Sequence, residues 1–267
     1  MNATAALAAT AFLVSLAFAL TTLERWLARR RRHEAAWTVS LFMFSTASLA
    51  YWAGAATGWG SLSFRVFYLF GAILNVPFLA LGTVYLLGGR RVGDKTAVVL
   101  ALSAAFAAGV VMAAPLVDAI PVDQLPQGRE VFGPAPRMMA AVGSGVGAVV
   151  VFAGAAWSAF ELVTGRRPGH GAASAITPRR LASTNVLIAL GTALLAAGGT
   201  LYSAEDEMTT FGIWLVLGVT ILFAGFLVSS PAPGGPAHGP PAGLAPFYVE
   251  LWEIATAPPQ PPARSQN

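Results

Sequence analysis

Residues 3–32 read ATAALAATAFLVSLAFALTTLERWLARRRR, a long apolar run that ends in a cluster of arginines. An apolar stretch of about 20 residues can cross the hydrocarbon core of a bilayer as an α-helix. The arginines follow the apolar run, whereas a secretory signal peptide carries its positive charge before it. The stretch therefore predicts a membrane-spanning helix whose arginine-rich end stays in the cytoplasm.

The whole chain has the composition of a membrane protein. Of its 267 residues, 56% are hydrophobic and 10% are charged, and its mean hydropathy is +0.66. Soluble domains carry about 25% charged residues, so the composition excludes a water-soluble globular protein. The chain has no cysteine, which excludes disulfides, thiolate nucleophiles and cysteine-ligated metals.

Charge-poor stretches of spanning length recur along residues 1–230, separated by Pro, Gly and charged residues. They predict an all-α membrane protein built as a seven-transmembrane-helix bundle. The seven expected spans are 3–23, 37–57, 65–88, 96–117, 138–162, 181–202 and 210–229. Residues 231–267 are rich in Pro and Gly and predict a cytoplasmic tail. Within it, the short amphipathic segment 245–256 is expected to dock a protein partner or to lie on the membrane interface.

The distribution of Lys and Arg predicts the orientation. In alternate segments, thirteen of the sixteen Lys and Arg fall on one side, while Asp and Glu divide equally between the two sides. Cationic segments stay in the cytoplasm, so we expect the N-terminus outside, the C-terminus inside, and a multi-pass protein of the cytoplasmic (inner) membrane. The basic pI then reflects contact of the inner face with anionic lipid, and no sequence pattern indicates nucleic-acid binding.

The sequence contains a candidate internal repeat. Residues 23–36 align with residues 160–173 at one offset, which pairs Glu24 with Glu161, Arg29 with Arg166 and His33 with His170. This predicts a 3+1+3 parallel repeat in which spans 1–3 and 5–7 are copies joined by span 4. Alternatively, both loops carry arginines simply because they face the cytoplasm. In topology and length, though not in motifs, the N-out 3+1+3 arrangement of residues 1–230 is similar to the SWEET sugar transporters.

Ionisable residues are missing from the middle of every predicted span, and the last span has no lysine. Proton relays, voltage sensors and a retinal Schiff base therefore lack their usual residues. The three histidines fall in cytoplasmic segments, which argues against intramembrane haem ligation or a Ser–His dyad. We expect no enzyme activity, cofactor or metal. A lipid-headgroup enzyme using His33 or His170 with Glu24 or Glu161 is a weaker alternative.

Small polar and aromatic residues recur at helical spacing within the spans and form a candidate solute path. Its residues are Tyr68, Asn75, Pro77, Asn185, Thr192, Trp52 and Trp59. Pro77 cannot donate to the carbonyl of Ile73, and a kink beside an Asn amide can line a cavity. The alternative is that these stripes and the Gly-x-x-x-Gly pair Gly143/Gly147 pack helices together.

Aromatic side chains gather at the outer ends of spans 2 and 3. Because Trp and Tyr favour the membrane interface, we expect most of them to be interface anchors. They are Tyr51, Trp52, Trp59, Phe64, Phe67, Tyr68 and Phe70. Trp52 and Trp59 are seven residues apart, so on one helix they would share a face and could stack on a ring-shaped solute.

Glu24 and Glu161 end spans 1 and 5 and suggest an inner gate tied to Arg29 or Arg166. The alternative is two solvated carboxylates paired with nearby arginines. Taken together, these patterns predict a transporter or binding protein for a small, largely uncharged solute held between two three-helix halves. The alternative is a non-catalytic scaffold or sensor subunit that recruits partners through its basic inner face and tail.

Overall fold

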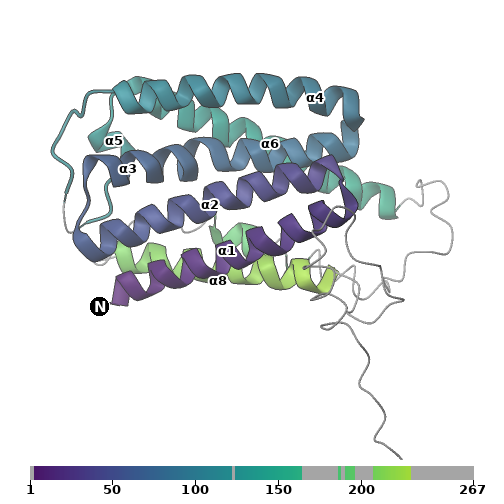
Figure 1. Cartoon of the computed structure of the whole chain (residues 1–267), viewed down its shortest axis with the longest axis horizontal. Coiled ribbons are helices and arrows are strands. Elements are labelled where there is room, and N and C mark those ends of the chain that lie inside the picture. The colour runs from purple at the N-terminus through teal and green to yellow at the C-terminus, as the bar shows by residue number, and fades with distance from the viewer. Residues whose placement is uncertain (1–2, 122–123, 164–185, 188–189, 196–206, 230–267) are drawn as a thin grey trace, which may run out of the picture. The chain divides into compact units, whose positions relative to one another are not determined.

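The computed structural model describes residues 3–121, 124–163, 186–187, 190–195 and 207–229, and this part of the chain is almost entirely helical. Apart from one antiparallel bridge between Leu116 and Phe132, the described residues contain no β-structure. Figure 1 shows the helices, whose bounds are α1 Ala3–Arg29, α2 Arg32–Thr57, α3 Ser61–Phe67, the π-helix η1 Tyr68–Leu74, α4 Asn75–Ala113, α5 Gly128–Val131, α6 Pro134–Val163 and α8 Glu207–Ser229.

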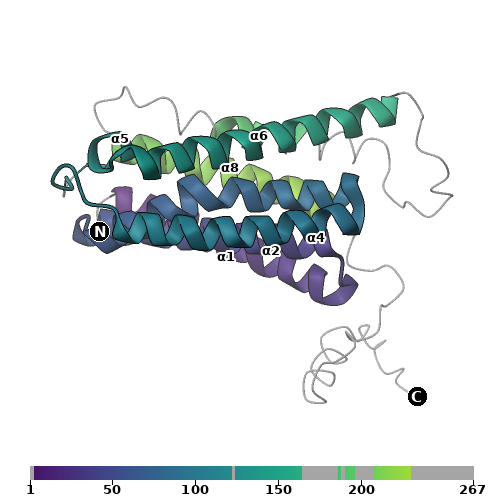
Figure 2. The same cartoon turned by 90° about the horizontal axis from the view of Figure 1, so that it is seen from above.

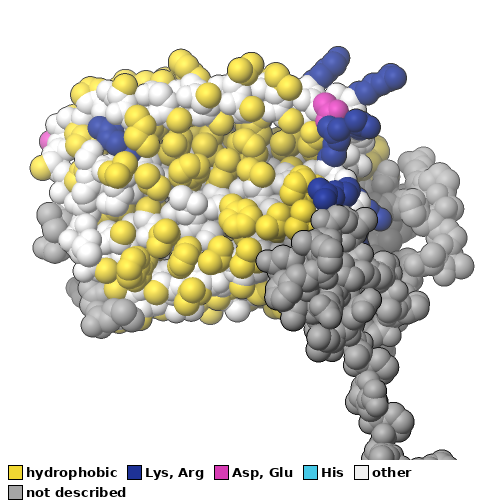
Figure 3. Space-filling model, viewed as in Figure 1, with side chains coloured by type: hydrophobic (Ala, Val, Ile, Leu, Met, Phe, Trp, Pro, Cys, Tyr) yellow, Lys and Arg dark blue, Asp and Glu magenta, His cyan; other side chains and the backbone are white. Residues whose placement is uncertain are grey.

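Five helical segments of the described chain are long and apolar enough to cross a membrane. They are Ala3–Arg29, Arg32–Thr57, Ser61–Ala113, Pro134–Gly154 and Met208–Val228. Hydrophobic side chains also cover much of the described surface, while Lys and Arg gather towards one end (Figure 3). A surface of this kind suggests a membrane-embedded protein because lipid, unlike water, solvates exposed apolar side chains.

The third segment reverses direction at Gly89. Its φ of 73° and ψ of −178° lie outside the helical region, in a conformation that is essentially restricted to glycine. The guanidinium of Arg65 donates hydrogen bonds to the carbonyls of Val111 and Ala114, at 2.8 Å for Ala114. These residues would be ~70 Å apart on one straight helix. The segment is therefore a hairpin whose two limbs lie side by side (Figures 1 and 2).

The helices pack as a series of neighbours. α1 lies against α2 and α8, α2 lies against η1 and α4, and η1 and α4 lie against α6. Figure 2 shows the same arrangement turned by 90°. At one end, the hydroxyl of Tyr51 donates to the carbonyl of Met208 at 2.6 Å, and the hydroxyls of Thr4 and Thr209 are 2.7 Å apart. These bonds tie the start of α8 to α2 and α1.

The aromatic residues at this end form a core instead of an interface belt. Tyr51 and Phe64 are fully buried, and Trp59 is 4% exposed. Phe64 stacks on Phe132 with ring centroids 5.2 Å apart, and Tyr68 lies 5.1 Å from the same ring. The expectation that most of these residues anchor the interface is therefore wrong for the buried ones, because their rings pack on one another and on Phe132 and Phe211.

Six of the seven expected spans, all but span 6, overlap the described helices or helix limbs along most of their length. Most of span 6 lies outside the described residues, so a count of seven is not decided. The chain divides into two units, Met1–Pro231 and Ala232–Asn267. Every described residue belongs to the first unit, and the predicted tail with its segment 245–256 lies outside the described residues.

Candidate functional site

Along η1 and α4, a stripe formed by Gly71, Asn75 and Gly82 faces α2. The hydroxyl of Ser40 donates to the side-chain oxygen of Asn75 at 2.7 Å and lies 3.0 Å from its backbone carbonyl. A Cβ on Gly82 would clash with the indole ring of Trp37, so that ring packs directly on the glycine. These contacts support the packing interpretation of the stripe, with Asn75 as an interhelical hydrogen-bond partner.

The glycines of α6 face the opposite side of η1 and α4. A Cβ on Gly143 would lie 2.9 Å from the carbonyl oxygen of Ile73, and one on Gly147 would lie 3.0 Å from the nitrogen of Pro77. The hydroxyl of Ser144 donates to the carbonyl of Ala72. Close backbone approach of this kind is the use of Gly-x-x-x-Gly pairs in membrane helices.

Pro77 lies just beyond the π-helix η1. The backbone N–H of Asn75 donates to the carbonyl of Phe70, five residues earlier, whereas Pro77 has no N–H to offer Ile73. Single π-helical turns are rare and recur at functional sites. The chain thus departs from regular α-helix where Gly143 and Gly147 of α6 approach its backbone.

A cleft of about 500 Å³ opens beside Pro77, between the two limbs of α4 and α6. We call it the membrane cleft. Its lining is Ile73, Leu74, Pro77, Ala80, Leu81, Val84, Thr96, Leu100, Ser103, Phe106, Ala107, Met138, Met139, Val142, Gly143, Val146, Gly147 and Val150. Two hydroxyl groups lie among these side chains, and no ionisable group does. Phe106 and Met138 are each about two thirds exposed, so the rim faces outward.

The three aromatic residues of the candidate path, Trp52, Trp59 and Tyr68, do not line the membrane cleft. Trp59 packs on Gly54 because the chain turns back at Gly58, where φ is 86°. Trp52, on α2, is 37% exposed. The prediction that Trp52 and Trp59 share a face is therefore wrong, since α2 ends between them. Tyr68 packs on Phe64, on Phe132 and over Gly128.

The remaining residues of the path belong to the second half of the chain. Asn185 lies outside the described residues. Thr192 lies in the helical stretch 190–195 and is half-buried. Whether they face a solute stays a prediction.

At the opposite end of α1, the buried carboxylate is Glu34 and not Glu24. Glu34 is 2% exposed, and one of its oxygens lies 3.9 Å from a guanidinium nitrogen of Arg25 and 3.9 Å from one of Arg29. Arg25 also lies 4.3 Å above the ring of Phe226 in α8. Glu24 is exposed, and it has no ion pair within the described residues.

The predicted inner gate is only partly described. Arg29 faces Glu34, as above, while Arg166 and the side chain of Glu161 lie outside the description. The gate therefore stays a prediction. Glu34 was not predicted from the sequence, although it is the third residue of α2, where a carboxylate interacts favourably with the positive end of the helix dipole.

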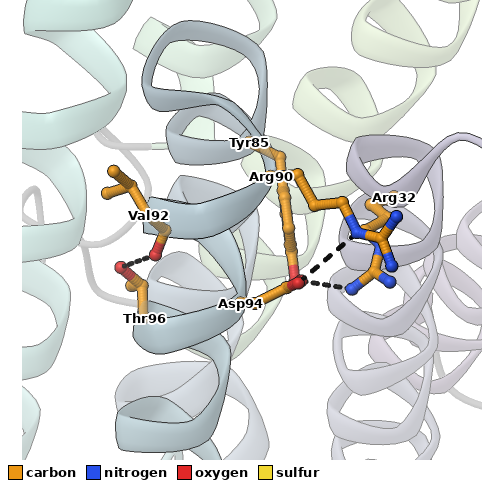
Figure 4. Close-up of polar contacts among 6 residues, drawn as sticks. All are labelled: Arg32, Tyr85, Arg90, Val92, Asp94 and Thr96. Carbon is orange, nitrogen blue, oxygen red and sulfur yellow. Dashed lines mark hydrogen bonds and ion pairs between the residues drawn. The ribbon is translucent and has the colours of Figure 1, made fainter.

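A second cluster, also not predicted from the sequence, joins α2 to the α4 hairpin (Figure 4). Arg32 pairs with Asp94, which also accepts a hydrogen bond from the hydroxyl of Tyr85 at 3.0 Å and lies 3.7 Å from Arg90. The i,i+4 spacing of Arg90 and Asp94 was the available signal. No group of three His, Cys, Asp or Glu that could hold a metal occurs within the described residues.

Comparisons of this chain with known protein families, with curated proteins and with solved structures found no match. Its function is therefore inferred from its own residues.

Proposed function

We propose that this protein binds a small, largely uncharged, membrane-soluble solute in the membrane cleft, as a transporter or solute-binding protein. The observation that carries the proposal is the cleft itself, about 500 Å³ of space lined by apolar side chains and the hydroxyls of Thr96 and Ser103. Sites for small molecules have about this volume and this mixture of apolar walls with a few polar groups.

The lining selects against charge. A charged group in such surroundings would lose its hydration without an ionic partner, which costs several kcal/mol or more. A neutral solute with one or two hydrogen-bonding groups could use Thr96 or Ser103. Because the rim side chains Phe106 and Met138 are exposed, we expect the solute to enter from the bilayer instead of from water.

A cleft-filling variant tests this function. Ser103→Phe places a ring in the cleft, whereas Ala101→Phe places the same ring on an exposed position of the same limb that does not line it. The purified proteins would be equilibrated with a panel of small uncharged solutes, and the retained solute identified by mass spectrometry. We expect the wild type and Ala101→Phe to retain a solute that Ser103→Phe loses. Equal retention by all three proteins, or by none, would refute the proposal.

We also propose the complete topology predicted above: seven spans, the N-terminus outside and two three-helix halves joined by span 4, in the cytoplasmic membrane. The clustering of Arg30, Arg32, Arg90 and Arg91 near the α1–α2 turn and the Gly89 hairpin supports the orientation. On this arrangement the membrane cleft is lined by spans 3, 4 and 5, so it lies where the first half meets the second.

A scaffold or sensor role is the second candidate. It is favoured by the exposed basic side chains at this same end, where Arg30, Arg31, Arg90 and Arg91 are all exposed. Such a protein would need its tail. If the protein is a scaffold, deletion of residues 232–267 would abolish its cellular function while Ser103→Phe would not. Cellular function that survives the deletion and is lost in Ser103→Phe would favour the transporter.

A further inference from the structure

A second pocket, of about 450 Å³, lies where the end of α1 and the start of α2 meet α4. We call it the inner pocket. It is lined by Trp26, Arg30, Arg32, Ala35, Ala36, Val39, Phe78, Leu81 and Tyr85. It lies at the arginine-rich end of the described chain and shares Leu81 with the membrane cleft, yet its chemistry is different.

The inner pocket is amphipathic. Ala36, Val39, Phe78 and Leu81 give it an apolar wall, and Arg30 and Arg32 bring two guanidinium groups to the same space. The guanidinium of Arg30 lies 5.6 Å from the ring centroid of Trp26, within cation–π distance. Apolar wall, indole and guanidinium together match a molecule with an anionic head and a hydrocarbon chain.

Positively charged side chains outnumber carboxylates around this pocket. Asp94 is shared by Arg32, Arg90 and Tyr85 (Figure 4). Arg30, in contrast, forms no ion pair with any described residue. Exposed Arg31, Arg91 and Lys95 lie nearby in sequence. Among the described residues of this end, the three carboxylates Glu24, Glu34 and Asp94 are outnumbered by eight Lys and Arg side chains, which favours an anionic ligand.

The backbone at Arg30 supports a role for its side chain. Arg30 has a φ of 53°, in the left-handed region, and lies in the two-residue turn between α1 and α2. A residue with a Cβ is strained there, whereas glycine is not. Glycine would serve this turn better, so an arginine here suggests that its charge is used.

We propose that the inner pocket is a binding site for one anionic phospholipid of the inner leaflet, with its phosphate at Arg30 and Arg32 and an acyl chain along Val39, Phe78 and Leu81. The site goes beyond general attraction of a basic face to anionic lipid, because it places one lipid between three helices. It does not depend on the solute proposed for the membrane cleft.

The strained position supplies a direct test. Full-length protein in neutral detergent would be incubated with equal amounts of phosphatidylglycerol and phosphatidylcholine, and retained lipid counted by native mass spectrometry. We expect one phosphatidylglycerol per chain. Arg30→Gly should lower its retention about fivefold, the factor that corresponds to ~1 kcal/mol for one arginine near an anionic headgroup. The same variant should unfold at an unchanged or higher temperature without lipid, because the backbone strain is gone.

Two further variants separate the lipid from its competitors. Arg91→Gln removes one charge at an exposed position that does not line the pocket, and should leave retention unchanged. Ala35→Phe fills the pocket without changing charge, and should reduce retention. Equal loss in Arg30→Gly and Arg91→Gln would indicate unspecific charge and overturn the proposal. Displacement of the lipid by millimolar inorganic phosphate, or retention undiminished in Ala35→Phe, would overturn it in favour of a headgroup-only phosphate site.

Discussion

Arg65, in α3, caps the C-terminal end of α4, which lies in the other limb of the hairpin. Its guanidinium donates to the carbonyls of Val111 and Ala114, and its Nε donates to the hydroxyl of Ser61 at 3.0 Å. The last carbonyls of a helix lack partners within the helix and carry partial negative charge. A cation that fills both needs at once is worth more than an exposed ion pair.

We predict that Arg65→Gln lowers the free energy of unfolding by about 1–3 kcal/mol, the usual cost of leaving buried polar groups without a partner. Arg65→Lys should cost less, because one ammonium group keeps the charge but not the fork of donors. The free energy would be measured by titration with a denaturing detergent. Arg129→Gln is the control, since Arg129 faces only exposed Glu130 at 3.4 Å among the ion pairs described. A larger loss for the control would contradict this role of Arg65.

Glu34 and Glu24 are expected to differ in their contribution to stability. Glu34 is buried between Arg25 and Arg29, while Glu24 is exposed. Removing a buried charge leaves its partners partly desolvated and unpaired. We predict that Glu34→Gln costs about 1–3 kcal/mol, reduced from the value for a fully buried pair because both arginines reach solvent. Glu24→Gln should stay within about 0.5 kcal/mol of wild type. If both variants lowered the free energy of unfolding equally in unfolding titrations, the different roles assigned to Glu34 and Glu24 would be wrong.

At the scale of elements, the contact of α6 with η1 and α4 depends on two glycines. A Cβ on Gly143 or Gly147 would meet backbone atoms at 2.9–3.0 Å, and backbone cannot move aside as a flexible side chain can. We predict that Gly143→Ala and Gly147→Ala each destabilise the protein by about 1–3 kcal/mol. Gly145 is the matched control because nothing lies within 4 Å of its Cβ position. Gly145→Ala should be neutral or stabilising by up to ~1 kcal/mol. A melting series with the opposite order would contradict this packing.

The hydropathy of the sequence predicts where the long helices lie along the chain, but not which face of each helix turns towards the core. Apolar length identifies α1, α2 and α8 without any tertiary knowledge. The preference of Trp for the membrane interface predicts the depth of Trp59 in the bilayer but not whether its ring faces lipid or the core, where it is found. The sequence likewise points to Glu24 at the end of the first span but does not indicate that Glu34 is the buried carboxylate. Which carboxylate turns inward depends on the turn at Arg30 and Arg31, which composition does not reveal.

The candidate site, too, was only partly predictable from the sequence. The stripe containing Asn75 was recognisable from its spacing, and packing was one of its two interpretations. Its partner Ser40 lies 35 residues away, and no sequence pattern joins the two. The membrane cleft was not predictable, because its lining comes from η1, both limbs of the hairpin and α6, which only the tertiary fold brings together. Pro77 is the candidate path residue that lines it.

At the scale of the whole molecule, the side of the membrane on which a segment lies depends on whether an even or an odd number of spans precedes it. Orientation and span number can therefore be tested together. The chain has no cysteine, so single cysteines can be placed without a background. Asp118 is exposed beyond the end of α4, and Arg91 is exposed beside the Gly89 hairpin. One limb of α4 separates them, so they should lie on opposite sides of the membrane, with Asp118 outside.

We predict that a membrane-impermeant maleimide labels Asp118→Cys in intact cells, and labels Arg91→Cys and Ser265→Cys only after the membrane is opened. The result for Ser265 tests the number of spans. Three crossings after Asp118, in the expected spans 5, 6 and 7, put the tail inside, whereas two would leave it outside with Asp118. Labelling of Ser265→Cys in intact cells would thus reduce the bundle to six spans and eliminate the second three-helix half, even if Arg91 kept its inner position.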